Sequence, residues 1–235
     1  MKKGKTIEKK ESDIEKEIVR TEEDVKRSEN KQLTWFFVIV GLIFAAVLVP
    51  YFWNESSKSF EFGGADWVVE DYEYLKIYHG RFLSFGNPNL FYNVYLRTDP
   101  RENDVVAEGT FDQFKYGGII SFAPEVDACR GELGRGVFDL SAFLRQGVGV
   151  GPVESGSTDK FVAVEEDRRF ATCNTGLDRT LVIVEIGEDS KVFQDEKNSY
   201  CYTIVARDCE DFSGIERFIA KSILDFDAAR NETSV

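Results

Sequence analysis

The sequence of 235 residues contains one histidine, His79, in the segment Tyr78-His79-Gly80 of an expected strand. A histidine side chain could act as a general base, and a hydrolase would place a nucleophile beside it. The sequence shows no Gly-x-Ser-x-Gly elbow or comparable nucleophile signature. We therefore assign no catalytic residue. A hydrolase with His79 or acidic residues in its site stays the alternative to a binding protein.

The four cysteines, Cys129, Cys173, Cys201 and Cys209, all lie in the C-terminal half of the chain. No C-x-x-C pair occurs and histidine is scarce, so two disulfides are favoured over a metal site or a reactive thiol. Cys201 and Cys209 bracket an expected strand, which separates their Cα atoms by roughly 25 Å at about 3.3 Å per residue. That span is too long for a disulfide. Each should pair with Cys129 or Cys173 instead.

A glycine- and arginine-rich segment, CRGELGRG, begins at Cys129. As a loop it could present converging backbone N–H groups, with Arg130 and Arg135 as weak candidates for anion binding. The spacing matches neither a P-loop nor a dinucleotide fingerprint, so a structural loop before a helix is the alternative. Further upstream, the acidic segment RTDPREND from Arg97 to Asp104 lacks the pattern of an EF-hand and is expected to be an ion-paired turn. We expect no metal and no cofactor.

The longest apolar stretch runs over 33–53 and carries no charged side chain. As a helix it would reach roughly 31 Å, which matches the hydrocarbon thickness of a bilayer. Lys26, Arg27 and Lys31 precede it, so the N-terminus is expected to be cytoplasmic and the remainder extracytoplasmic. We predict an uncleaved signal-anchor in the cell membrane, with a cleaved signal peptide as the competing interpretation.

The formal net charge of −13 is concentrated after the apolar stretch. An acidic surface repels phosphate backbones and anionic lipid headgroups, which argues against nucleic acid as a partner. A protein or glycan partner at the cell surface is compatible with this charge. Asn54 and Asn231 begin Asn-x-Ser/Thr sequons and are candidate glycosylation sites, as in an exterior glycoprotein.

The pattern of elements predicts an α+β protein with a β-rich exterior domain, a mixed sheet and two packed helices. We expect a charged cytoplasmic tail that forms a helix at 1–32, the transmembrane helix at 33–53, a flexible tether at 54–66, the domain at 67–228 and a frayed C-terminus at 229–235. Expected strands cover 74–85, 90–97, 105–111, 119–123, 161–164, 168–173, 180–186 and 201–207. Expected helices cover 138–146 and the segment from Ser213, where Ser213 and Glu216 have capping-box spacing.

Alternation and periodicity give the expected core. In the second strand, Leu90, Tyr92, Val94 and Leu96 share one face and should point inward. The run LVIVEI predicts a strand buried on both faces. In the last helix the apolar residues fall on one stripe, which should pack on the sheet.

Three phrases, YNVYLRTDPREND, DACRGELGRG and SYCYTIVARDCEDFSGIERF, resemble segments of a group of archaeal proteins that have one membrane-spanning anchor. The resemblance implies an anchored exterior domain and no particular activity. We therefore expect a membrane-anchored extracytoplasmic binding or surface-assembly domain. The alternatives are an anchored hydrolase and an accessory subunit of a membrane complex.

Overall fold

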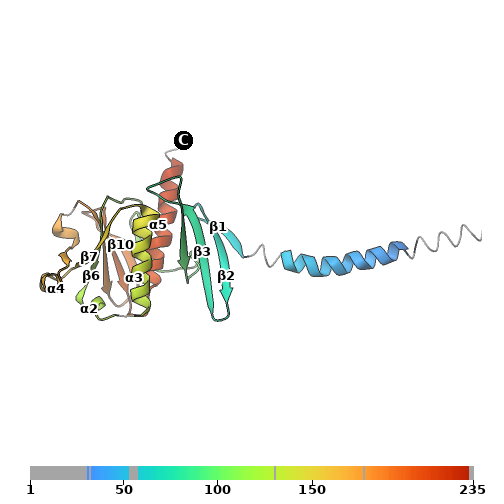
Figure 1. The fold of residues 1–235 in the computed structure, drawn as a ribbon, viewed down its shortest axis with the longest axis horizontal. Coiled ribbons are helices and arrows are strands. Elements are labelled where there is room, and N and C mark those ends of the chain that lie inside the picture. The colour runs from blue at the N-terminus through green and yellow to red at the C-terminus, as the bar shows by residue number, and fades with distance from the viewer. Residues whose placement is uncertain (1–30, 32, 53–57, 130, 177, 233–235) are drawn as a thin grey trace, which may run out of the picture. The chain divides into compact units, whose positions relative to one another are not determined.

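The computed structural model describes residue 31 and residues 33–52, 58–129, 131–176 and 178–232 (Figure 1). The chain forms two compact units, 1–57 and 58–235. The predicted tail helix and the first part of the predicted tether lie outside the described residues.

The first unit contains the helix Leu33–Phe52, whose mean hydropathy is 2.5 and of which no part is buried. Twenty helical residues reach about 30 Å, enough to cross the hydrocarbon core of a bilayer. The prediction of one apolar N-terminal helix is therefore confirmed. Such a helix is consistent with a membrane anchor or a signal sequence.

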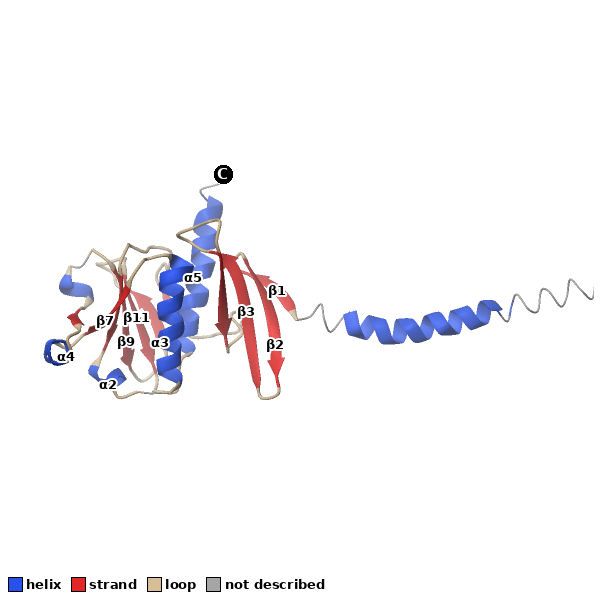
Figure 2. Cartoon of the chain, viewed as in Figure 1, coloured by secondary structure: helices blue, strands red, loops and turns tan. Residues whose placement is uncertain are grey.

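The second unit is a mixed α+β domain with two sheets (Figure 2). The four-stranded sheet is antiparallel in the order β1-β2-β3-β4. The seven-stranded sheet has the order β5-β10-β11-β9-β6-β7-β8, and only its β10–β11 pair is antiparallel. The first sheet comprises β1 (Ser59–Phe62), β2 (Ala65–Tyr72), β3 (Leu75–Leu83) and β4 (Phe91–Leu96). The second comprises β5 (Val106–Glu108), β6 (Gly118–Phe122), β7 (Val153–Ser157), β8 (Arg169–Phe170), β9 (Thr180–Ile186), β10 (Lys191–Gln194) and β11 (Cys201–Ala206).

Two helices lie between the sheets (Figure 1). They are α3 (Glu132–Ala142), which continues into a π-helical turn at Phe143–Val148, and α5 (Ser213–Glu232). The main core draws buried side chains from all three layers, for example Trp67 of β2, Phe218 of α5 and Tyr202 of β11. This arrangement buries one face of the four-stranded sheet against the helices.

The strongest sequence patterns form the elements that they predict. The run Thr180–Ile186 is β9, in which the first five residues are buried as expected for a strand covered on both faces. In α5, Ile215, Phe218, Ile219 and Ile223 are at most 2% exposed and pack against the core. The hairpin between β3 and β4 turns at 86–89 as predicted, although Leu90 is exposed and lies outside the core.

The glycine-rich segment after Cys129 is a helix, and the prediction of a loop there is wrong. Gly131, at φ 78°, precedes α3, which begins at Glu132. A Cβ atom on Gly136 would lie 2.9 Å from Ile215 Cδ1, so this glycine permits close contact between α3 and α5. Packing, and not a loop conformation, accounts for glycine at that position.

The predicted strand at 161–164 is also wrong, because these residues belong to the short helix α4 (Lys160–Glu165). The Asp159 carboxylate accepts hydrogen bonds from the backbone N–H groups of Phe161 and Val162, at 2.7 and 3.1 Å. This N-cap outweighs the strand preference of the β-branched residues. The sequence patterns also missed β2, β7, β10 and the short helix α2 (Pro124–Asp127), and they overestimated the lengths of β5 and β8.

The boundaries of the domain differ from the expectation. Ser59–Phe62 forms β1, so part of the predicted tether belongs to the sheet, and α5 continues to Glu232 through the segment predicted to fray. The predicted capping box does not form. The Asp211 carboxylate instead accepts the Ser213 N–H at 3.0 Å, while Glu216 bonds to the end of β4.

Candidate functional site

The face of the four-stranded sheet that points away from the helices carries half-exposed aromatic side chains. Strand alternation directs Tyr92, Val94 and Leu96 of β4 toward the core and Phe91, Asn93 and Tyr95 the opposite way. Phe91 is 51% exposed and Tyr95 is 50% exposed. We call this surface the outer sheet face. It comprises Glu61, Asp66, Val68, Glu70, Tyr72, His79, Arg81, Phe91, Asn93 and Tyr95.

A connected network of hydrogen bonds orders the side chains on this face. His79 Nδ1 lies 3.1 Å from Glu70 Oε1, and His79 Nε2 lies 3.1 Å from Asn93 Oδ1. The Tyr72 hydroxyl donates to Glu70 Oε2 at 2.7 Å. The Tyr95 ring stacks on the imidazole with 4.5 Å between the ring centroids. Five side chains from three strands thus hold one another in place.

The register of the sheet creates this network. His79 lies opposite Val68 on one side and Tyr95 on the other, and Glu70 and Asn93 lie diagonal to it. Side chains at such cross-strand positions are within contact distance. The hydrogen bond from Tyr72, followed by the bond from His79, lowers the pKa of Glu70 against the opposing effect of burial. Glu70 is therefore a carboxylate at neutral pH.

Arg81 lies beside the network, with its guanidinium carbon 4.2 Å from the centroid of the Phe91 ring. In the part of the chain that the structure describes, no carboxylate lies within ion-pair distance of Arg81. Its position is held by the cation–π contact, which leaves guanidinium N–H groups available for a ligand.

Tyr95 also lines a cleft between the end of β4 and the two helices. The other polar side chains of this cleft are Arg97, Glu132, Arg135, Asp139 and Glu216. The cleft volume is about 10 Å³, which is room for one water molecule and too little for an organic ligand. A ligand could lie across this cleft but not inside it.

Charged groups of both signs alternate in the cleft. Arg97 Nη1 lies 2.5 Å from Glu132 Oε2 and its guanidinium is stacked over Phe212 at 5.0 Å. Arg135 Nε lies 3.8 Å from Asp139 Oδ2, and burial raises the pKa of Asp139. The cleft offers both hydrogen-bond donors and acceptors.

The predicted anion-binding arginines do not share a loop. Arg135 lies within α3 beside Asp139, and Arg130 lies outside the described residues. The acidic segment after Arg97 is an ion-paired turn, as expected, because Arg101 Nη2 lies 2.6 Å from Asp99 Oδ2 and stacks over Phe60. Among the described residues, no group of three or more His, Cys, Asp or Glu side chains is arranged to hold a metal ion.

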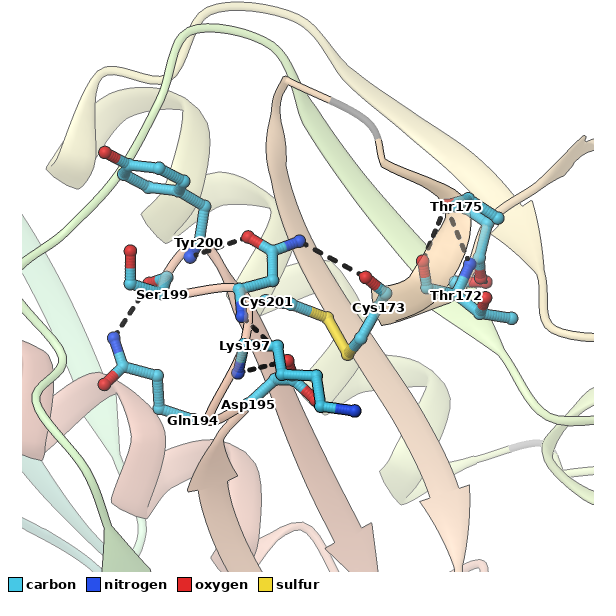
Figure 3. The surroundings of a disulfide bond; sticks show 12 residues. Thr172, Cys173, Thr175, Gln194, Asp195, Lys197, Ser199, Tyr200 and Cys201 are labelled. Carbon is cyan, nitrogen blue, oxygen red and sulfur yellow. Dashed lines mark hydrogen bonds between the residues drawn. A yellow bond between two sulfur atoms is a disulfide. The ribbon is translucent and has the colours of Figure 1, made fainter.

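The cysteines form two pairs at disulfide distance, Cys129–Cys209 and Cys173–Cys201, with Cα atoms 5.1 and 5.6 Å apart. Cys201 and Cys209 have different partners, in agreement with the prediction. Figure 3 shows the second pair, which joins a 3-10 turn at Cys173–Thr175 to the start of β11. Asn198 reinforces the junction through its side-chain N–H, which donates to the Cys173 carbonyl at 3.5 Å.

Of the two sequon asparagines, one lies among the residues that the structure describes. Asn231 is exposed near the end of α5, with its side-chain nitrogen 3.3 Å from Asp227 Oδ2. Asn54 lies outside the described residues. Whether either residue carries a glycan stays a prediction.

Sequence reasoning singled out His79 but missed its partners Glu70, Tyr72, Asn93 and Tyr95. One signal could have found two of them, because the inward set predicted for β4 implies that Asn93 and Tyr95 point outward. A scan of protein-family models and searches of curated proteins and of solved structures find no match to this chain.

Proposed function

We propose that this protein is a membrane-anchored exterior binding module that recognises its partner through the outer sheet face. The observation that carries the proposal is the ordered aromatic and polar network around His79, on the sheet face opposite the packed core. The fold does not need such a network to bury its core. Half-exposed rings at fixed positions are typical of interaction surfaces.

Preorganisation supports binding. The rings of Tyr95 and His79 are stacked, and the Glu70 carboxylate is held by two hydrogen bonds. Side chains already fixed before association lose little rotamer entropy when a partner binds. Surface aromatic residues that pack on one another without such bonds would give up more of this entropy.

Binding is favoured over the hydrolase alternative by the surroundings of His79. Both ring nitrogens of His79 are occupied, one by Glu70 and the other by Asn93. A histidine base in acyl transfer uses one nitrogen for the orienting carboxylate and the other for a nucleophile hydroxyl. Here an amide takes the place of the hydroxyl.

Anchoring in the cell membrane, with the N-terminus cytoplasmic and the domain outside, is part of the proposal. It is supported by the apolar helix Leu33–Phe52, by the Lys and Arg residues that precede it, and by two cysteine pairs at disulfide distance in the domain. An accessory subunit of a membrane complex would use the same surface for a protein partner.

A crosslinking experiment in intact membranes tests the binding surface. A photo-crosslinking diazirine residue replaces Val68, which is 44% exposed on the outer sheet face and lies outside the hydrogen-bond network. In a matched variant it replaces Tyr74, which is 97% exposed in the turn between β2 and β3. We expect crosslinked protein or glycan adducts at position 68 and background at position 74. Equal labelling at the two positions would overturn the proposal.

A further inference from the structure

We infer that the ligand of the outer sheet face is a neutral glycan that lies along the edge strand β4. This inference rests on the proposed function and specifies its partner. Four independent features of the surface lead to it: the spacing of its rings, its hydrogen-bonding groups, its charge and its area.

The first feature is a row of two rings on one strand. Phe91 and Tyr95 lie four residues apart on the same face of β4, which places them roughly 13 Å apart at about 3.3 Å per residue. A side chain of β3 covers one face of each ring, Arg81 on Phe91 and His79 on Tyr95. Since β4 ends the sheet, a chain-like ligand has access to both rings from the open edge.

Aromatic rings bind sugars through C–H groups. One face of a pyranose ring presents several C–H bonds, whose weak positive charge is attracted to the negative face of an aromatic ring. Tyrosine suits this contact because its body is apolar and its hydroxyl stays in water. Two such rings roughly 13 Å apart fit two units of a linear oligosaccharide that are separated by at least one other unit.

The second feature is the set of hydrogen-bonding groups around Tyr95. Asn93 lies between the two rings, and its side-chain amide, which contacts His79 Nε2 through one group, has a second polar group that can bond a ligand. Arg81 supplies further N–H donors, and Glu70 supplies acceptors. Planar amide, guanidinium and carboxylate groups can each bond to two neighbouring hydroxyls, which is the pattern that a sugar presents.

The cleft beside Tyr95 extends this set. Tyr95 and, from α3, Arg135 and Asp139 are among the residues that line it. A glycan that crosses the mouth of the cleft would replace water on groups that already alternate in sign. Their mutual contact at 3.8 Å leaves both with capacity for additional hydrogen bonds.

The third feature is charge. The whole chain carries −13, so the domain repels an anionic polysaccharide and also a second copy of itself. The outer sheet face carries charges of both signs: Arg81 lies directly opposite Asp66, Glu61 lies beside them, and Glu70 is bonded to His79. A surface with mixed local charges on an acidic domain favours a ligand that has no net charge.

The fourth feature is area. The four strands contain 4, 8, 9 and 6 residues. Each residue covers about 16 Å² of a sheet at roughly 3.3 Å rise and 4.8 Å spacing, so the face spans about 430 Å². A stable protein interface buries about 800 Å² per partner. The face is small for a protein partner or a dimer and sufficient for a short glycan.

The test uses the full chain in detergent micelles and measures binding to arrayed neutral hexose and N-acetylhexosamine oligosaccharides, with polyuronates as anionic comparators. We expect binding to at least one neutral glycan, with a Kd that changes less than twofold between about 0.05 and about 0.5 M salt. Tyr95→Ala and Asn93→Ala should each weaken binding about tenfold or more. Tyr74→Ala removes a more exposed tyrosine, in the turn between β2 and β3, and should leave the Kd unchanged.

Three results would overturn the inference: no binding to any neutral glycan, tighter binding to polyuronates, or an equal loss in Tyr74→Ala and Tyr95→Ala. The outcome for the proposed function is separate. If no glycan binds and the crosslinker at position 68 still captures a protein in membranes, the glycan inference fails and the binding surface stands.

Discussion

At the scale of single residues, Glu216 shows how one buried carboxylate fixes the end of a strand. Its side chain lies on α5 and is 6% exposed. Its two oxygens accept hydrogen bonds from the backbone N–H groups of Arg97 at 2.5 Å and Thr98 at 2.9 Å. These bonds tie the turn after β4 to the central helix. Burial raises the pKa of Glu216 in spite of them, so the carboxylate holds its place at an electrostatic cost.

Replacing this carboxylate should therefore destabilise the protein. In Glu216→Ala, two backbone N–H groups lose their acceptors, and each unsatisfied buried donor costs about 1–3 kcal/mol. We expect the free energy of unfolding to fall by about 2–4 kcal/mol. Urea denaturation of the protein in micelles, followed by a spectroscopic signal of the domain, measures it. Glu232→Ala, at an exposed position of the same helix, is the control and should change stability by less than about 0.5 kcal/mol. Equal stability of the two variants would contradict this account.

At the scale of elements, the contact between α3 and α5 depends on the absence of a side chain at Gly136. A Cβ atom there would meet Ile215 Cδ1 at 2.9 Å and Phe212 Cβ at 3.1 Å, whereas a Cβ atom on Gly134 would meet nothing within 4 Å. The two glycines lie two positions apart on the same helix, so they differ in packing and share the same helical propensity.

This difference predicts opposite effects of the same substitution. Gly136→Ala should lower the free energy of unfolding by about 1–3 kcal/mol, because the methyl group overpacks the contact between the helices. Gly134→Ala should raise it by about 0.5–1 kcal/mol through helix propensity. Thermal or urea unfolding of both variants measures the effect. A gain of stability at both positions would show that α3 can move away from α5 at little cost.

The helix α3 also shows which elements can be predicted from the sequence and which cannot. Long periodic segments such as β9 and α5 were predictable, because burial on both faces or along one stripe leaves a strong pattern. The start of α3 was not, since Gly134 and Gly136 resemble a loop until the neighbouring helix is known. The helix α4 was mistaken for a strand because the capping bonds of Asp159 decide its conformation.

The candidate site was less predictable than the fold. His79 stood out as the one histidine of the sequence, yet Glu70 is nine residues and Asn93 fourteen residues away from it. Their meeting depends on the register of β2, β3 and β4, which is set by two hairpin turns and not by local spacing. A cross-strand site of this kind becomes visible only when the pairing of the strands is known.

At the scale of the whole molecule, the two cysteine pairs connect segments that are far apart in the sequence. Cys129–Cys209 spans 80 residues and joins the end of α2 to the segment before α5. Cys173–Cys201 spans 28 residues and fastens a 3-10 turn to β11 on the far side of the seven-stranded sheet. By loop-closure entropy each pair contributes about 3–5 kcal/mol. Such cross-links persist in an oxidising compartment, in line with a domain outside the cell.

The membrane topology can be tested with single cysteines at positions on opposite sides of the apolar helix. All four native cysteines are paired, so the wild type should not react with a membrane-impermeant maleimide. Tyr74→Cys places a thiol at a position that is 97% exposed in the domain, and we expect it to be labelled in intact cells. Ser28→Cys introduces a thiol before the helix and, under the proposed topology, should react only after the membrane is permeabilised, because a flank rich in Lys and Arg favours the cytoplasmic side. The reverse pattern would place the domain inside the cell, where the outer sheet face could not bind a glycan of the cell surface. Labelling of the wild type would show that the cysteine pairs are reduced in the cell.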